Sequence, residues 1–195
     1  MKGVMWGTDY ERHILHCFQI QYSKVKRVRI IELLLCLPSD DEILMCCDGA
    51  SRGNPGLAGY GFIFRNNSGD FVFAEYGGLG IVTNYIDEFI ASIRALEWEV
   101  ENQWFKVILQ SDSKDCITSL TSHQIPWFLI ARWQRIVAGM LLISYRHVYR
   151  ETNFSADHFA KKGVHLQKGQ TLNYKDRPAC LTRMETPDQS YYKFD

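Results

Sequence analysis

Residues 48–64, DGASRGNPGLAGYGFIF, decide the fold of this chain. The apolar run at 43–47 leads into Asp48 and is typical of a buried strand. The glycine-, asparagine- and proline-rich segment that follows is typical of a turn, and a second strand is expected at 60–65. After a further turn, a third strand is expected at 70–76 and ends at a glycine pair. This region is therefore predicted to be an antiparallel meander.

Downstream of this meander the pattern alternates between helices and strands. Apolar residues recur at steps of three and four from Ile86 to Val100, which indicates an amphipathic helix with Thr83 or Asn84 as its cap. The remaining expected elements are a strand at 105–110, helices at 114–120 and 126–140, a strand at 141–149 and a helix at 153–162. This order predicts an α/β architecture, with helices packed on a mixed sheet.

The composition is that of a globular domain without a charge bias. The chain has 195 residues, 46% of them hydrophobic, and 22 basic residues balance 22 acidic ones. Proteins that hold nucleic acid by bulk electrostatics are usually basic, so a nucleic-acid ligand here would need a local positive patch. No apolar run is long enough to span a bilayer. The six cysteines lack C-x-x-C spacing, so we expect free thiols in a soluble, intracellular protein of the nucleus or cytoplasm.

The sequence pattern divides the chain into three parts. Residues 1–42 are an N-terminal extension of unclear structure, and their basic run at 24–29 is either a solvated face or a nucleic-acid arm. Residues 43–165 contain the alternating strands and helices. Residues 166–195 are polar and irregular, and we interpret them as a C-terminal tail.

Four acidic residues fall where these elements are expected to meet. Asp48 ends the first strand and Asp112 follows the fourth, whereas Glu88 and Asp157 lie at the starts of two helices. Ligands of α/β sheets bind at the carboxyl ends of parallel strands and at helix N-termini. Clustered carboxylates repel one another unless hard divalent cations neutralise them. Taken singly, each acid is more simply a turn residue, a cap or a helix-terminal charge, but the four together predict a two-metal phosphodiester site.

The same motifs resemble ribonuclease H type 1, and in particular the plant ribonuclease H-like proteins related to non-LTR retrotransposons. The resemblance covers about residues 43–165 and rests on DGASRGNPGLAGYG at 48–61, TNYIDE at 83–88, QSDS at 110–113 and RETNFSAD at 150–157. It implies a ribonuclease H-like fold with five strands in the order 3-2-1-4-5 and strand 2 antiparallel. It also implies an endonuclease that hydrolyses the RNA strand of RNA–DNA hybrids with two Mg²⁺ ions, for which Mn²⁺ can substitute.

The resemblance further implies a role for each site residue. Asp48 would bridge both metal ions and Asp157 would complete the site of the ion that activates water. Glu88 and Asp112 would hold the ion at the leaving 3′ oxygen. His147 lies ten residues before Asp157, at the spacing of a histidine that assists product release; alternatively, it is a packed or surface residue of the last strand. Contacts to the two nucleic-acid strands are implied for Ser51, Gly53, Asn54, Thr83 and Asn84, with Thr83 at a phosphate of the DNA strand.

The sequence also departs from the bacterial form of this family. Asp157 follows Asp112 by only 45 positions, and the cations between 113 and 140 are Lys114, Arg132 and Arg135. We therefore expect the basic handle of the bacterial proteins to be absent. A weakly active or inactive nucleic-acid-binding relative derived from a retroelement is the main alternative. Another nuclease of this fold and a protein-interaction module are further alternatives, and a monomer is expected.

Overall fold

The computed structural model describes residues 7–20 and 29–194, and two compact units are distinguished within the chain. The smaller unit comprises residues 1–32 and 192–195, and the larger runs from Leu33 to Tyr191. Helix α1 (Asp9–Cys17) belongs to the smaller unit, and β1 (Ile30–Leu33) pairs with β8 (Tyr191–Phe194) in a two-stranded sheet. Most of the basic run at 24–29 lies outside the described residues.

The larger unit contains a six-stranded mixed sheet. Its strands are β2 (Ile43–Gly53), β3 (Gly56–Arg65), β4 (Phe71–Val82), β5 (Lys106–Ser111), β6 (Leu142–His147) and β7 (Thr171–Tyr174), in the order β6-β5-β2-β3-β4-β7. β3 is antiparallel to β2 and β4, whereas β5 is parallel to β2 and β6. The first five strands therefore have the predicted order 3-2-1-4-5, with the second strand antiparallel.

Two features of the sheet differ from the prediction. β4 was expected to end before Gly77 but continues to Val82. A Cβ on Gly77 would lie 2.6 Å from the Tyr60 ring, so this glycine allows close packing inside the strand instead of forming a turn. The short strand β7 extends β4 on its outer edge, within the segment that was interpreted as an irregular tail. Its residues are mostly exposed and show no apolar alternation, which is why the pattern gave no strand signal.

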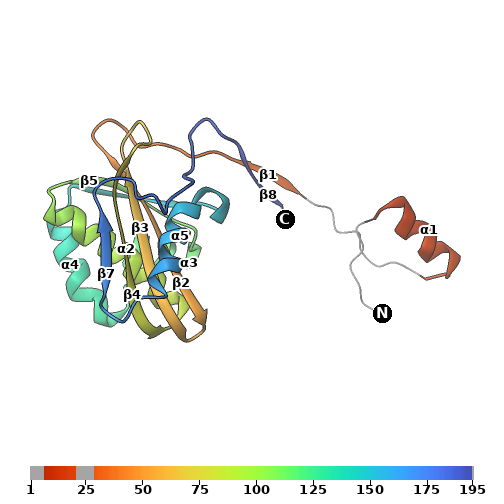
Figure 1. The fold of residues 1–195 in the computed structure, drawn as a ribbon, viewed down its shortest axis with the longest axis horizontal. Coiled ribbons are helices and arrows are strands. Elements are labelled where there is room, and N and C mark those ends of the chain that lie inside the picture. The colour runs from red at the N-terminus through yellow and green to blue at the C-terminus, as the bar shows by residue number, and fades with distance from the viewer. Residues whose placement is uncertain (1–6, 21–28, 195) are drawn as a thin grey trace. The chain divides into compact units, whose positions relative to one another are not determined.

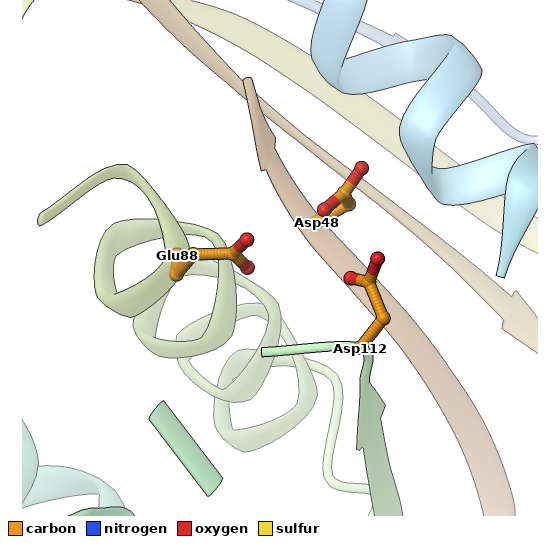
Figure 2. A group of neighbouring side chains, drawn as sticks. All are labelled: Asp48, Glu88 and Asp112. Atoms are coloured by element: carbon orange, nitrogen blue, oxygen red, sulfur yellow. The ribbon is translucent and has the colours of Figure 1, made fainter. Parts of the chain in front are cut away.

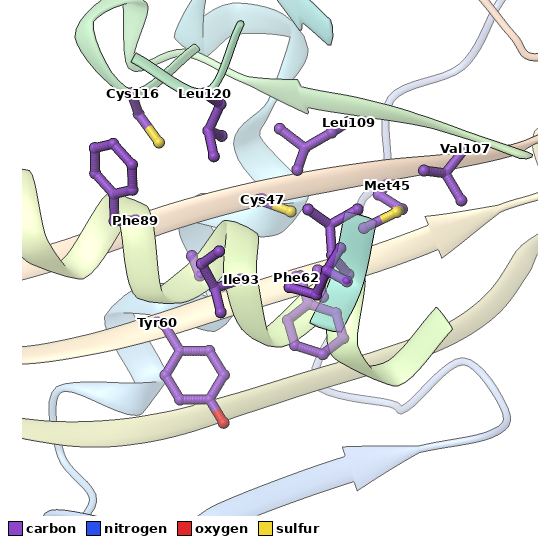
Figure 3. Close-up of a cluster of buried hydrophobic side chains, with 14 of the residues drawn as sticks. Met45, Cys47, Tyr60, Phe62, Phe89, Ile93, Val107, Leu109, Cys116 and Leu120 are labelled. Carbon is purple, nitrogen blue, oxygen red and sulfur yellow. The ribbon is translucent and has the colours of Figure 1, made fainter. Parts of the chain in front are cut away.

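Helices cover both faces of this sheet (Figure 1). Helices α2 (Asn84–Glu101), α3 (Lys114–Thr121), α4 (Ile130–Gly139) and α5 (Phe154–Gly163) have the positions expected from the sequence. Met45 and Cys47 point into a core shared with α2, α3 and α4, as Figure 3 shows for the side chains around Phe89 and Ile93. The intervening Leu44 packs on the opposite face, against α5 and residues near the C-terminus. This period-two alternation is that of a strand buried on both sides.

Helix α5 contacts the sheet at backbone distance. A Cβ on Gly61 would lie 2.3 Å from the Ala160 nitrogen, and one on Gly59 would lie 2.2 Å from the carbonyl carbon of Gly163. These two strand glycines belong to the Gly-Tyr-Gly motif, so the motif is explained by the approach of α5. This contact allows α5 to lie along β3. Asp157 lies in the first turn of α5.

The segment after residue 165 is also fixed to α5 and β3. The Arg65 guanidinium is buried and forms an ion pair with the buried carboxylate of Glu185. That carboxylate accepts hydrogen bonds from the backbone nitrogen of Ser155 at 2.8 Å and from its hydroxyl at 2.5 Å. Glu185 thus satisfies a free N–H group in the first turn of α5. Within the described residues, no helix is long and apolar enough to cross a membrane.

Candidate active site

Three carboxylates meet at the end of β2. One oxygen from each of Asp48, Glu88 and Asp112 lies within 4.8 Å of the others, and we call this group the acidic cluster. Figure 2 shows the three side chains pointing toward one another from β2, α2 and the end of β5. Cys47 pairs with Ser111 in the parallel ladder, so Asp48 and Asp112 each follow a paired residue at one edge of the sheet. The predicted convergence of these two strand ends is therefore present.

Glu88 reaches the cluster because α2 approaches the β2 backbone. It lies in the second turn of α2, one residue later than the first turn expected from the sequence, and its carboxylate accepts a hydrogen bond from the Gly49 nitrogen at 3.3 Å. A Cβ on residue 49 would lie 2.4 Å from the Asp87 carboxylate and 2.6 Å from the Glu88 nitrogen. Glycine is therefore required at position 49 by the close packing of strand and helix.

Burial and like charge disfavour ionisation of the cluster. Burial, followed by the charges of Glu88 and Asp112, raises the pKa of Asp48 well above its ordinary value. Burial and the charge of Asp112 raise the pKa of Glu88 in the same way. Within the described part of the chain, both Asp48 side-chain oxygens and Asp112 Oδ1 are buried without a hydrogen-bond partner. Such orphaned oxygens fit a divalent cation, which would provide both the missing contacts and the compensating charge.

Asp157 lies beside the cluster. It lines a cavity of about 470 Å³ together with Glu88, and its charge contributes to the raised pKa of Asp48. Its Oδ2 accepts a hydrogen bond from Lys161 Nζ at 2.5 Å, one helical turn along α5. Asp157 is thus adjacent to the three other acids but, with this lysine contact, is outside the group that lies within 4.8 Å.

His147 lies on β6, away from the cavities beside the cluster. It pairs with Ser111 in the β5–β6 ladder, its side chain is exposed, and its ring meets that of Tyr149 edge-on at 5.7 Å. It does not line either cavity beside the acidic cluster. The structure thus places it as an exposed residue at the end of a strand, and its assistance to product release stays a prediction.

Arg150 is the basic residue that sequence reasoning missed at this site. Its Nε lies 3.4 Å from Asp112 Oδ2, and it lines the cavities on both sides of the cluster. Partial burial lowers the pKa of Arg150, but the charges of Asp112, Asp48 and Asp157 more than offset this and raise it above its ordinary value. Its position seven residues before Asp157, in RETNFSAD, was the available signal.

The residues expected to contact nucleic acid gather beside the cluster. Ser51 donates a hydrogen bond to the Asn84 side chain at 2.6 Å, and the Asn84 nitrogen donates to the Asn54 side chain at 3.2 Å. Asn54 and Asn84 line a cavity of about 410 Å³ that also borders Glu88 and Asp112. Gly53 has a φ of +104°, which the hairpin turn requires and glycine tolerates.

Thr83 marks the start of α2 but makes no side-chain capping hydrogen bond. It lines a separate cavity of about 860 Å³, whose walls include Ile86, Ile90 and Phe128. Thr83 and Asn84 are consecutive residues but line different cavities: Thr83 lines this one, and Asn84 lines the cavity beside Glu88 and Asp112.

This chain is similar to a known protein family and to proteins named ribonuclease H. The profile of the family described as reverse transcriptase-like matches residues 46–163. A ribonuclease HI of Halobacterium salinarum is 33% identical over 122 residues, which cover 60% of this chain and 61% of that protein. The chain thus spans about three fifths of the length of this curated relative.

Solved structures also match part of this chain. The crystal structure of ribonuclease H1 from Halobacterium salinarum has a TM-score of 0.58 at 30% identity and covers 63% of this chain and 97% of its own. The N-terminal ribonuclease H domain of a Mycobacterium tuberculosis protein has a TM-score of 0.59 at 25% identity, with 63% and 93% covered. The predicted ribonuclease H-like fold is confirmed by these matches.

Proposed function

The chain belongs to the reverse transcriptase-like family, and we propose that it is an endonuclease that hydrolyses the RNA strand of RNA–DNA hybrids. The observation that carries this proposal is the acidic cluster with its orphaned oxygens. The similarity to proteins named ribonuclease H supports the substrate class.

The acidic cluster and Asp157 are proposed to hold two divalent cations, with Mg²⁺ the physiological ion and Mn²⁺ a substitute. When bound, such ions lower the pKa of an attacking water and neutralise the leaving oxygen. Asp48 lies centrally and is proposed to contact both ions, with Asp157 on one side and Glu88 and Asp112 on the other. Burial of these carboxylates excludes bulk water, which strengthens their electrostatic interaction with a bound cation.

The surrounding residues are proposed to orient the substrate. Asn54 and Asn84 present amide groups beside the cluster, where 2′-hydroxyls and base edges of a hybrid minor groove would be recognised. Ser51 orders the Asn84 side chain, Gly53 shapes the hairpin turn, and Thr83 is proposed to contact a phosphate of the DNA strand. Arg150 is proposed to stabilise negative charge on the scissile phosphate, because it contacts Asp112 and lines the cavities on both sides of the cluster. Assistance to product release by His147 stays a separate proposal that rests on its spacing of ten residues from Asp157.

Some finer assignments are part of the same proposal. RETNFSAD supports a relationship to plant ribonuclease H-like proteins derived from retroelements. The thiols at the six cysteine positions are free, which supports a reducing, intracellular environment. A monomer and a division into an extension, a nuclease domain and a C-terminal segment are likewise proposed.

A weakly active or inactive nucleic-acid-binding relative is the second candidate. The zero net charge and the Lys161–Asp157 ion pair favour it, because this lysine competes with a cation for the Asp157 carboxylate. The orphaned oxygens of Asp48 favour the active enzyme, because a protein without turnover gains nothing from burying them unpaired.

The test is cleavage of a labelled RNA–DNA hybrid in Mg²⁺ or Mn²⁺, with single-stranded RNA and duplex DNA as controls. We expect metal-dependent cutting of the hybrid RNA only, and loss of this cutting in Asp48→Asn. A folded wild-type protein that binds the hybrid but leaves it intact in both metals would reject the enzyme and support the binding relative.

A further inference from the structure

The cavity on the α5 side of the acidic cluster has a basic wall as well as an acidic one. Its acidic lining residues are Asp87, Glu88 and Asp157. Arg52, Lys161 and His165, which we call the basic row, line it as well. This chain has no net charge to attract a polyanion, so binding requires a local group of basic side chains such as these beside the acids.

The basic row follows from the directions of two elements. Arg52 lies four residues after Asp48 on β2, and residues separated by four positions in a strand share a face. Lys161 lies four residues after Asp157 on α5, and such residues share a helix face. Each element therefore carries an acid followed by a base on one face, and Arg52, Asp157 and Lys161 line the same cavity. Arg52 lies ~13 Å beyond Asp48 along β2. Lys161 lies about one helical turn beyond Asp157 along α5.

A hydrogen bond fixes the end of the row. Arg52 Nη2 donates to His165 Nε2 at 2.9 Å, so the neutral His165 ring carries its proton on Nδ1. Among the described residues Arg52 forms no ion pair with a carboxylate, which leaves its charge uncompensated. Lys161 contacts Asp157 but retains further N–H donors.

We propose that the basic row binds a backbone phosphate of the strand whose neighbouring phosphodiester lies at the acidic cluster. This inference rests on the proposed function, because the strand at the cluster is the RNA strand of a hybrid. Arg52 provides a planar donor group suited to two phosphate oxygens, and Lys161 and His165 add charge and a ring N–H. The row is a binding site and takes no part in bond cleavage.

The test measures binding and cleavage separately. Binding of a fluorescein-labelled RNA–DNA hybrid is followed by anisotropy without metal, across a series of salt concentrations, for the wild type, Arg52→Ala and Arg52→Lys. Arg135→Ala is the matched control, because Arg135 is an exposed arginine of α4 that lines none of the cavities beside the cluster. Cleavage in Mg²⁺ is measured on the same variants.

We expect Arg52→Ala to weaken hybrid binding by about 5- to 30-fold and to reduce the slope of log K against log salt by about 0.7–0.9, the value for one lost phosphate contact. KM should rise by a similar factor with kcat within about twofold, and Arg52→Lys should recover part of the affinity. If Arg52→Ala binds with the affinity and salt slope of Arg135→Ala, the proposal is wrong. If the wild type never cleaves but Arg52→Ala still loses affinity and slope, the nuclease assignment fails and the phosphate site stands.

Discussion

At the scale of single residues, Arg150 brings a positive charge to a cluster of acids. Its side chain opposes a bound cation electrostatically but favours a phosphate. We therefore predict that Arg150→Ala lowers kcat by about 10- to 100-fold at saturating metal, while Mn²⁺ binds as tightly as in the wild type or more tightly. Arg150→Lys should show an intermediate kcat, because a lysine keeps the charge but loses the planar group.

Titration of the protein with Mn²⁺, followed by its paramagnetic resonance signal, separates the two effects of Arg150. Weaker Mn²⁺ binding in Arg150→Ala would contradict the prediction, since it would mean that the arginine supports the metal site. His147→Ala is the companion variant, and we expect it to retain most of the activity because the side chain lies on the exposed end of β6.

Glu99 is a further buried acid, which lies on α2 and outside the acidic cluster. Both of its carboxylate oxygens are buried without a hydrogen-bond partner in the described structure, and burial raises its pKa to about 8. The folded state therefore holds a proton that the unfolded state releases near pH 4.5. The contribution of Glu99 to stability is fully present below pH 4.5 and is lost as the pH rises toward 8.

We predict that Glu99→Gln removes this loss. The variant should match the wild type in stability near pH 4 and exceed it by about 2–4 kcal/mol at pH 9, because glutamine needs no deprotonation. Urea unfolding of both proteins across this pH range measures the difference. A constant difference at all pH values would mean that Glu99 ionises normally in the folded protein.

The sequence predicted those site residues that follow a local, periodic pattern of apolar residues. Asp48 and Asp112 follow apolar runs, so strand pairing alone brings them together. Arg150 was missed because it follows β6 whereas its partner Asp112 follows β5, and no spacing within one element encodes that contact. The burial of Glu99 is hidden for the same reason, since its neighbours come from the tertiary packing.

At the scale of elements, a buried ion pair between Arg65 of β3 and Glu185 connects the C-terminal segment to β3 and to the start of α5. Removing one partner of a buried pair leaves the other charge uncompensated, and this typically costs about 3–5 kcal/mol. We predict such a loss for Glu185→Gln, in which Arg65 keeps its charge. The double variant Arg65→Met/Glu185→Leu should recover much of it, because no buried charge remains.

Chemical denaturation of the wild type and these two variants measures how much stability is lost when the pair is broken and how much returns when both charges are removed. A single variant that unfolds like the wild type would show that water reaches this pair in solution. The pair also explains a limit of the sequence. Arg65 ends β3, and Glu185 lies 120 positions later. No sequence pattern links residues so far apart, so the C-terminal segment was interpreted as a tail.

At the scale of the whole chain, the matched family region and the folded unit have different lengths. The family profile ends at residue 163, whereas the larger unit continues to Tyr191 and begins at Leu33. Leu35 packs in the core on the α5 face, before the predicted boundary at 43. The motifs inside the domain could be recognised in the sequence because each lies within a short segment. The domain boundaries could not, because they depend on single long-range contacts.

We therefore predict that a fragment of residues 33–191 folds cooperatively, whereas a fragment of residues 43–165 does not. The shorter fragment loses Leu35, whose burial is worth about 1.5–3 kcal/mol, and Glu185, whose loss costs about 3–5 kcal/mol. Together these approach the total stability of a typical domain, about 5–15 kcal/mol. Thermal unfolding followed by circular dichroism compares the two fragments with the full chain. A cooperative transition in the shorter fragment, at the temperature of the longer one, would show that the sequence-derived boundaries of 43 and 165 were sufficient.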